Sequence, residues 1–371
     1  MPNTRRMMMA AAGASTGATP YKLFAWGINN NGQLGDGTQT NRSSPVQIGD
    51  AEWLSTAGDC SGHTMAIKSD YTLWSWGHGE YGKTGHNNTT DLSSPVQVGS
   101  ATFSHTSCNV SGSAAINTDG ELYTCGDNHS RLGLGSGAGA KSVLTKVGSK
   151  TNWVTVNGTD DHMGAVDGDG KLYTWGVGTN GRLGHGNTTT QHVPTQVGSL
   201  TNWASVSCAQ SHTIALKTDG TLWAWGFNVY GMLGDGSTTS RSSPVQIGSL
   251  TTWRQANAGS YSSFGTTTGN TLFSWGWGGG AYFPKLGLNN LTTYSSPVQV
   301  PGTTWSTHFR AVNHSLCLRT DGTLWSWGRN ADGRLGNGAT AHKSSPIQIG
   351  SATDWESAFA GGNGSSFGFR P

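Results

Sequence analysis

The sequence predicts an all-β protein, a seven-bladed β-propeller closed by pairing of the N- and C-terminal strands in one blade. Three observations predict it: a Trp-Gly step that returns about every 50 residues, apolar positions that alternate as in strands, and a unit whose halves lie at the two ends of the chain. We expect residues 21–371 to form the propeller and residues 1–20 to form a separate N-terminal arm.

The Trp-Gly pair keeps a nearly constant spacing along the chain. Successive positions are 50, 49, 50, 50, 50 and 52 residues apart, which defines seven units. Sequence periods of this length are typical of propellers and other repeat architectures. Six units carry tryptophan and the third carries cysteine at the same place, in the order Trp26, Trp76, Cys125, Trp175, Trp225, Trp275 and Trp327.

Each unit has the pattern of β-strands joined by tight turns. In the stretch from His212 to Gly226, apolar residues alternate on both sides of Asp219-Gly220, a dipeptide that favours a β-hairpin. After this turn, Trp223 and Trp225 share one face of a strand whose other face is also apolar. A strand that is apolar on both faces indicates a sheet packed between two neighbouring sheets, as in a propeller blade.

The two ends of the chain predict how the ring closes. The first unit begins directly at its Trp-Gly strand, residues 23–27. The last unit stops after Trp355 and residues 367–369, which match the strands that elsewhere precede such a Trp-Gly strand. One blade assembled from both ends would leave no exposed sheet edge.

These motifs resemble the repeat of the regulator of chromosome condensation family. The resemblance rests on Trp225-Gly226 followed by Leu233-Gly234, on the segment Ser211–Leu216, and on the same pattern over residues 21–371. It implies a seven-bladed propeller. It implies no single function, because the family includes a nucleotide-exchange factor for a small GTPase, scaffolds and an inhibitor of β-lactamases.

Two departures from the exchange-factor pattern count against exchange activity. The chain has no basic N-terminal tail beyond Arg5-Arg6. Its even period also leaves no room for the inserted hairpin that the resemblance would require for contact with a GTPase.

Composition argues against several other functions. Charged residues are only 11% of the chain and the net charge is +2, so no basic stripe indicates nucleic-acid binding. No apolar run approaches the roughly 20 residues that span a bilayer. The sequence has no nucleophile or phosphate-loop motif. We therefore expect no enzyme activity, catalytic residues, metal or cofactor.

A set of registered histidines and a set of loop aspartates could nevertheless suggest a site. His63, His162, His212 and His314 recur at one position, either as metal or acid–base groups or as structural residues hydrogen-bonded within their own blades. We favour the structural role, because equivalent positions in a ring are dispersed. The loop aspartates are lone carboxylates beside glycines and form no calcium loop; they are Asp36, Asp235 and Asp332. We expect Asp36→Ala to have little effect on stability.

The repeat breaks between Trp275 and Leu286, where three extra residues are inserted. This loop carries Trp277, Tyr282 and Phe283 in a glycine-rich segment. Insertions in repeat proteins map to loops, often on the binding face, and aromatic residues suit a contact surface. Two alternatives stay open: these side chains form a binding loop, or they pack onto the rim.

The N-terminal arm is outside the repeat and contains a candidate anchor, residues Arg5, Arg6, Met7, Met8 and Met9. A signal peptide is one interpretation of this segment. The arm also resembles the start of tailed-phage virion proteins, particularly those of marine phages. We therefore expect a non-enzymatic capsid or tail component that is assembled in the host cytoplasm and anchored to other virion subunits, with a host receptor or glycan as a further partner.

Two alternative functions remain. The first is a soluble, cytoplasmic regulatory protein, either an exchange factor or an enzyme inhibitor. The second is a sugar-binding propeller in which repeated loops each hold one glycan. Exposed aromatic residues repeated in most blades would favour the sugar-binding alternative.

Overall fold

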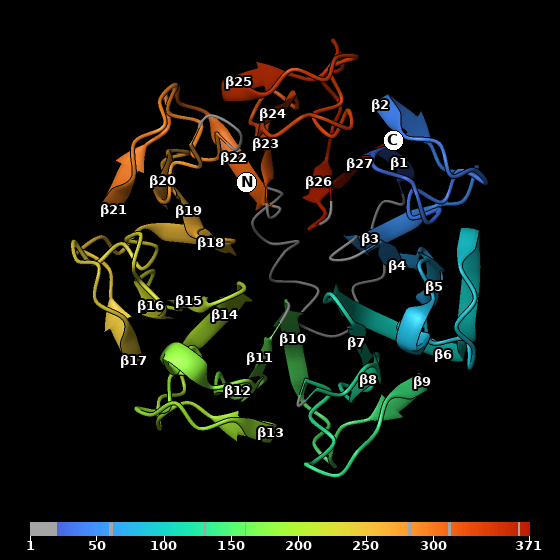
Figure 1. Ribbon diagram of the computed structural model, residues 1–371, viewed down its shortest axis with the longest axis horizontal. Helices are drawn as coiled ribbons and strands as arrows, with labels where there is room; N and C mark the ends of the chain where they lie inside the picture. The colour runs from blue at the N-terminus through green and yellow to red at the C-terminus, as the bar shows by residue number, and fades with distance from the viewer. Residues whose placement is uncertain are drawn as a thin grey trace.

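The computed structural model describes residues 21–371 except 59–61, 130, 160, 281–283, 311–312 and 363. The described residues form seven antiparallel four-stranded blades arranged around a common axis (Figure 1). In each blade the first strand lies near the axis and the last lies at the rim. The predicted fold class is therefore confirmed.

The first two complete blades share one long strand. The first contains β3 (Trp53–Gly58), β4 (His63–Lys68), β5 (Thr72–Gly77) and β6 (Leu92–Cys108), and the second continues with β7 (Gly112–Asn117), β8 (Leu122–Gly126) and β9 (Lys141–Lys146). The first half of β6 pairs with β5, as in Gln97 opposite Trp74. Its second half pairs with β7, beginning at Phe103 opposite Asn117. Strand β6 is thus the rim strand of one blade and the inner strand of the next.

The next four blades repeat one order of strands from the axis outward. Two of them consist of β10 (Trp153–Gly158), β11 (His162–Asp167), β12 (Leu172–Gly176) and β13 (Gln191–Gln196), and of β14 (Trp203–Cys208), β15 (His212–Lys217), β16 (Leu222–Gly226) and β17 (Arg241–Gln246). The other two consist of β18 (Trp253–Gly259), β19 (Ser262–Thr267), β20 (Leu272–Gly276) and β21 (Tyr294–Gln299), and of β22 (Trp305–Arg310), β23 (His314–Arg319), β24 (Leu324–Gly328) and β25 (Lys343–Gln348).

The two ends of the chain build the seventh blade together, as the sequence predicts. Its order is β26 (Ser357–Ala360), β27 (Ser365–Arg370), β1 (Lys22–Gly27) and β2 (Arg42–Gln47). Strand β1 pairs with β27 along its whole length, from Lys22 opposite Arg370 to Gly27 opposite Ser365. Two short 3₁₀ helices lie in loops, η1 (Glu80–Gly82) and η2 (Thr179–Gly181).

The core lies in the seams between adjacent blades. The Trp-Gly tryptophans are fully buried, and each indole N–H donates to a main-chain carbonyl of the preceding blade, as from Trp225 to Arg182 O at 2.9 Å. The bond from Trp26 to Arg334 O, 3.1 Å, repeats this contact where the ends meet. The same packing explains the glycine of the Leu-Gly step, because a Cβ on Gly184 would lie 2.7 Å from the Trp225 indole nitrogen.

The registered histidines are structural, but their hydrogen bonds cross the seams and do not stay within one blade as expected. His63 Nε2 lies 2.8 Å from Ser113 Oγ, and His162 Nε2 lies 2.6 Å from Thr213 Oγ1. His212 and His314 make the same contact with a serine of the following blade. Burial is the main cause that holds the pKa of His63 and of His162 well below the usual value of 6.5.

The expectation that Asp36 stands alone is wrong. Its carboxylate is nearly buried and accepts hydrogen bonds from Asn29 Nδ2 at 3.0 Å and from the Thr38 hydroxyl at 2.7 Å. It also pairs with Arg42 at 2.7 Å. Burial alone would raise the Asp36 pKa, but the bonds from Thr38 and Arg42 lower it below its usual value. Sequence spacing could not show these contacts, because the loop folds back on itself.

The other two aspartates of the set are also paired. Asp235 repeats the Asp36 arrangement, since it accepts bonds from Asn228, Ser237 and Arg241. Asp332 forms an ion pair with Arg334. None of the three is the isolated surface carboxylate that the sequence suggested.

Candidate binding surface

One face of the ring is built from two kinds of loop, which we call the WG-loop face. It comprises the loops that follow each Trp-Gly strand and the loops that join the inner strand of each blade to its second strand. In every blade a backbone N–H two residues beyond the Trp position donates to the carbonyl that precedes the second strand. Trp277 N donates to Tyr261 O at 2.7 Å, and Phe227 N donates to Ser211 O at 2.9 Å.

Three aromatic side chains meet on this face, and we call them the aromatic cluster: Tyr230, Tyr261 and Trp277. The rings of Tyr230 and Trp277 are 5.9 Å apart and tilted by 32°. Tyr261 meets Tyr230 edge-on at 5.7 Å and Trp277 edge-on at 6.2 Å. Tyr230 comes from the loop after β16, whereas the other two belong to the next blade. The cluster therefore bridges two blades.

A buried lysine supports the cluster. Lys285 Nζ lies 5.0 Å from the ring centre of Trp277 and 5.9 Å from that of Tyr261. The same ammonium group donates to Ser260 O at 3.0 Å. Because the lysine side chain is only 4% exposed, its attraction to the ring faces is weakly screened by water. The ammonium group therefore contacts two rings of the cluster at once.

The outer part of the cluster is open to solvent. Tyr230 is 40% exposed and its neighbour Val229 is 53% exposed. Large apolar side chains at loop tips tend to mark contact surfaces when they gather in one place. In the other blades the position of Tyr261 carries small or polar residues, namely Gly62, Ser111, Asp161, Ser211, Asn313 and Gly364. The clustering is thus a departure from the repeat at one sector of the ring.

The structure places only one of the predicted binding residues. Trp277 is half-buried and lies in the aromatic cluster. It therefore packs against neighbouring rings and also stays partly exposed, so both alternatives from the sequence apply to it in part. Tyr282 and Phe283 lie outside the described residues, as do the anchor residues Arg5, Arg6, Met7, Met8 and Met9. Tyr230 and Tyr261 were not among the residues predicted from the sequence. A comparison of the repeats position by position would have shown Tyr261 where the other units carry smaller or polar residues.

Buried or partly buried cations also recur on this face. One repeat position carries Lys83, Arg131, Arg182, Lys285 and Arg334. The main-chain carbonyl at this position accepts the indole bond of the next blade, except at Lys83, where the donor is the Cys125 thiol. Arg131 and Arg182 share the carboxylate of Asp161, at 3.1 and 2.7 Å. Their ion pairing and burial favour a structural role over catalysis. Within the described residues, no three His, Cys, Asp or Glu side chains gather as a metal site would require.

Comparison with known proteins agrees with the repeat pattern. A family model described as the RCC1-like domain matches residues 63–367, and a model of the regulator of chromosome condensation (RCC1) repeat matches residues 22–67. A search of curated protein sequences finds no match. Among the described residues, no helix is long and apolar enough to cross a membrane.

Several solved structures share the fold at low sequence identity. Human WBSCR16 is 20% identical, with a TM-score of 0.82 over 95% of this chain and 99% of that chain. Yeast RCC1 (Prp20), solved with Kap60 bound, is also 20% identical, with a TM-score of 0.84 over 99% of this chain and 92% of that chain. A further structure of Prp20p from Saccharomyces cerevisiae is described with its binding properties to Gsp1p and histones; it is 20% identical, with a TM-score of 0.82 over 98% of this chain and 94% of that chain.

Proposed function

Because the chain belongs to the RCC1-like domain family, we propose that it is a non-enzymatic propeller that binds a protein partner through the aromatic cluster on its WG-loop face. The fold supplies a rigid ring, and the loops on its faces are free to vary. The proposal concerns the sector formed by Val229, Tyr230, Tyr261 and Trp277.

The observation that carries this proposal is the exposed aromatic contact between two blades. Tyrosine and tryptophan are enriched among the residues that dominate binding energy at protein interfaces. Here they gather next to the loop that carries the three-residue insertion, and Lys285 Nζ lies 5.0 Å from the ring centre of Trp277. A contact surface that is already ordered loses less conformational entropy when a partner binds.

Two related structures are consistent with a protein partner. The yeast protein is described as bound to Kap60 in one structure, and its binding to Gsp1p and histones is described with another. These partners belong to the yeast protein. For this chain the comparison supports only the proposal that a propeller of this shape can serve as a binding scaffold.

The direct test is substitution of Tyr230 with a matched control elsewhere in the ring. Tyr81 occupies the equivalent loop position in another blade and is 47% exposed. Partners would be captured from the source cells on immobilised wild-type protein, identified by mass spectrometry and then measured as purified proteins by calorimetry. Tyr230→Ser should weaken binding at least about 30-fold, as expected for an interface hot spot, whereas Tyr81→Ser should leave it nearly unchanged. Equal binding by the two variants would contradict the proposal.

A finer proposal is that the partner is a capsid or tail subunit and that the protein is a virion component of a tailed bacteriophage. It rests on the sequence of residues 1–20 alone, through its likeness to the start of phage virion proteins. A chain without residues 2–18 should still fold but should no longer join the particle. Mass spectrometry of purified particles would measure its copy number. Normal incorporation of the truncated chain would contradict the anchor, while leaving the aromatic cluster open to its own test.

A further inference from the structure

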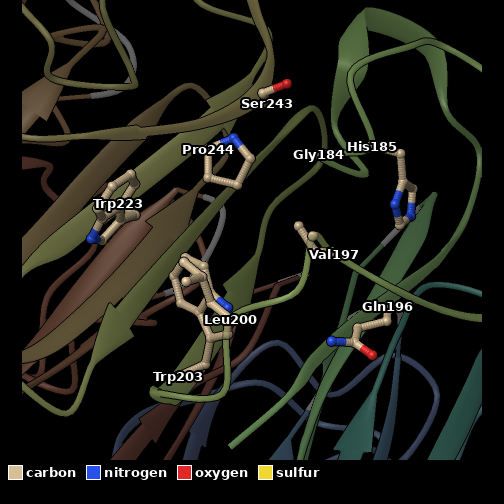
Figure 2. A pocket seen from close by; sticks show the side chains of 10 residues that line it. Gly184, His185, Gln196, Val197, Leu200, Trp203, Trp223, Ser243 and Pro244 are labelled. Carbon is tan, nitrogen blue, oxygen red and sulfur yellow. The ribbon is translucent and has the colours of Figure 1, made fainter.

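Two grooves lie in blade seams at equivalent positions of the repeat, and we call them the seam grooves. The first has a volume of about 550 Å³ and is lined by His185, Gln196, Leu200, Trp203, Trp223 and Ser243, among others. The second, of about 580 Å³, has the corresponding residues Asn337, Gln348, Ala352, Trp355, Phe24 and Ser44, together with Arg370. Figure 2 shows the first groove, with Trp203 and Trp223 on one side and Gln196 and His185 on the other.

The seam grooves are separate from the aromatic cluster. Strands β14 and β16 both run toward the WG-loop face, where Cys208 and Gly226 end them. Trp203 and Trp223 lie near the opposite ends of these strands. A ligand in the first groove would therefore lie away from Trp277, and variants at the two surfaces can be compared.

Each groove contains a buried hydrogen-bond donor that has no partner among the described residues. Trp203 and Trp355 are 3% and 5% exposed, and neither indole N–H is hydrogen-bonded. By contrast, the indole of Trp223 donates to Thr221 Oγ1 at 2.9 Å. Buried polar groups are nearly always paired, and each exception needs a reason. The indole nitrogen is unpaired at the same repeat position in both grooves, which indicates a cause common to the two grooves.

The unpaired N–H faces the edge of the groove. In Figure 2 the indole nitrogen of Trp203 lies beside Leu200, an exposed turn residue. Trp203 and Leu200 both line the groove, so the unpaired donor belongs to a side chain of its wall. A small displacement of Leu200 would open this donor to an acceptor.

The lining of the first groove indicates the chemistry of the occupant. It contains no lysine, arginine, aspartate or glutamate. His185 adds no charge at neutral pH, because burial lowers its pKa below the usual 6.5. The remaining groups are aromatic faces and the neutral donors and acceptors of Gln196 and Ser243. One cation lies beside the aromatic wall, because Lys217 Nζ is 3.8 Å from the ring centre of Trp223 and 5.2 Å from that of Trp203. A neutral molecule with an apolar face and several hydroxyl groups matches the aromatic and uncharged groups that line the groove.

We propose that the seam grooves bind neutral saccharide units, one in each groove. The C–H face of the sugar packs against the aromatic wall, and a sugar oxygen accepts the hydrogen bond from the Trp203 or Trp355 indole. Equivalent grooves around one ring would let a glycan chain with a repeated sugar contact several of them, which raises the overall affinity. The proposal does not depend on a protein partner at the aromatic cluster.

The experiment uses the whole chain and a set of neutral probes. These are the methyl glycosides of glucose, galactose, mannose and N-acetylglucosamine, with a tetrasaccharide of each sugar. Saturation-transfer NMR would identify the glycosides that bind, and calorimetry would measure their affinity and stoichiometry. We expect one sugar class to bind and its tetrasaccharide to bind more tightly than the monosaccharide.

The decisive variant is Trp203→Phe combined with Trp355→Phe, which removes both unpaired donors and keeps aromatic rings. The fold should accept it, because Phe103 occupies the same repeat position naturally. The variant should bind the selected glycoside about three- to tenfold more weakly, the effect of losing one neutral hydrogen bond in each groove. Trp277→Ala, at the aromatic cluster, should bind as the wild type does. Absence of binding by every glycoside, unchanged affinity of the double variant, or equal weakening by Trp277→Ala would each overturn the proposal.

Discussion

Removing the Asp36 carboxylate should destabilise the propeller although Asp36 lies in a loop. The carboxylate accepts bonds from Asn29 Nδ2 at 3.0 Å, Thr38 N at 3.0 Å and Arg42 Nε at 2.8 Å, and one from the Thr38 hydroxyl. After truncation to alanine, Asn29 keeps bonds to two main-chain carbonyls, and the half-buried Arg42 can turn to water. The loss is therefore smaller than for a fully buried ion pair, and we expect about 2–3 kcal/mol.

The measurement is urea unfolding followed by tryptophan fluorescence, with the free energy of unfolding compared between variants. Asp36→Asn should lose only about half as much, because an asparagine already serves this position at Asn337, where it accepts a bond from Asn330 at 3.1 Å. The exposed Asp50 is the matched control, and Asp50→Ala should stay within about 0.5 kcal/mol of the wild type. An Asp36→Ala protein as stable as the Asp50→Ala protein would refute the reasoning.

Two further predictions concern the seams. Trp225→Ala should cost about 3–5 kcal/mol in the same unfolding assay, because the side chain is fully buried between blades. Trp225→Phe should cost less, since Arg182 O keeps the bond from the Thr213 hydroxyl at 2.8 Å. The unfolding free energy should also fall as the pH drops below 6.5, the usual pKa of histidine, because burial holds the pKa of His63 and His162 lower and the unfolded chain takes up the protons. Each of these histidines should contribute about 1.4 kcal/mol per pH unit to the slope of the unfolding free energy against pH. The slope measured for His162→Gln should be smaller by the contribution of one histidine.

The repeat predicts the ring because the seams reuse the same contacts. A tryptophan, a Leu-Gly step and a hydroxyl residue recur at fixed spacing, and each has one partner in the neighbouring blade. The closing blade was predictable for the same reason, since its halves carry the missing parts of one unit. The continuous strand β6 was not predictable, because Gly99 lies between its halves and carries the features of a turn.

The candidate site was only partly predictable, because its contacts depend on the arrangement of separate loops. Trp277 was visible as part of an insertion, but Tyr230 and Tyr261 are distant in sequence and meet only where two blades adjoin. The histidine bonds were missed for a related reason. Periodicity shows that residues are equivalent, but it does not show whether their partners lie in the same blade or in the next one.

The contacts in the seams restrict which residues can change without weakening the ring. This restriction differs between the two proposed surfaces. A residue used in every seam, such as the buried tryptophan of a Trp-Gly strand, cannot change in one blade without weakening a contact that the ring requires. Within the loops of the WG-loop face, the Leu-Gly step and the carbonyl that accepts the indole bond are constrained in the same way, whereas the residue two positions beyond the Trp position supplies only a backbone hydrogen bond, which any residue but proline can donate. Tyr230 and Trp277 can therefore serve a partner found at one sector only. The indole N–H of Trp203 belongs to the repeated frame, so a ligand that uses it should occupy several seams of the same ring.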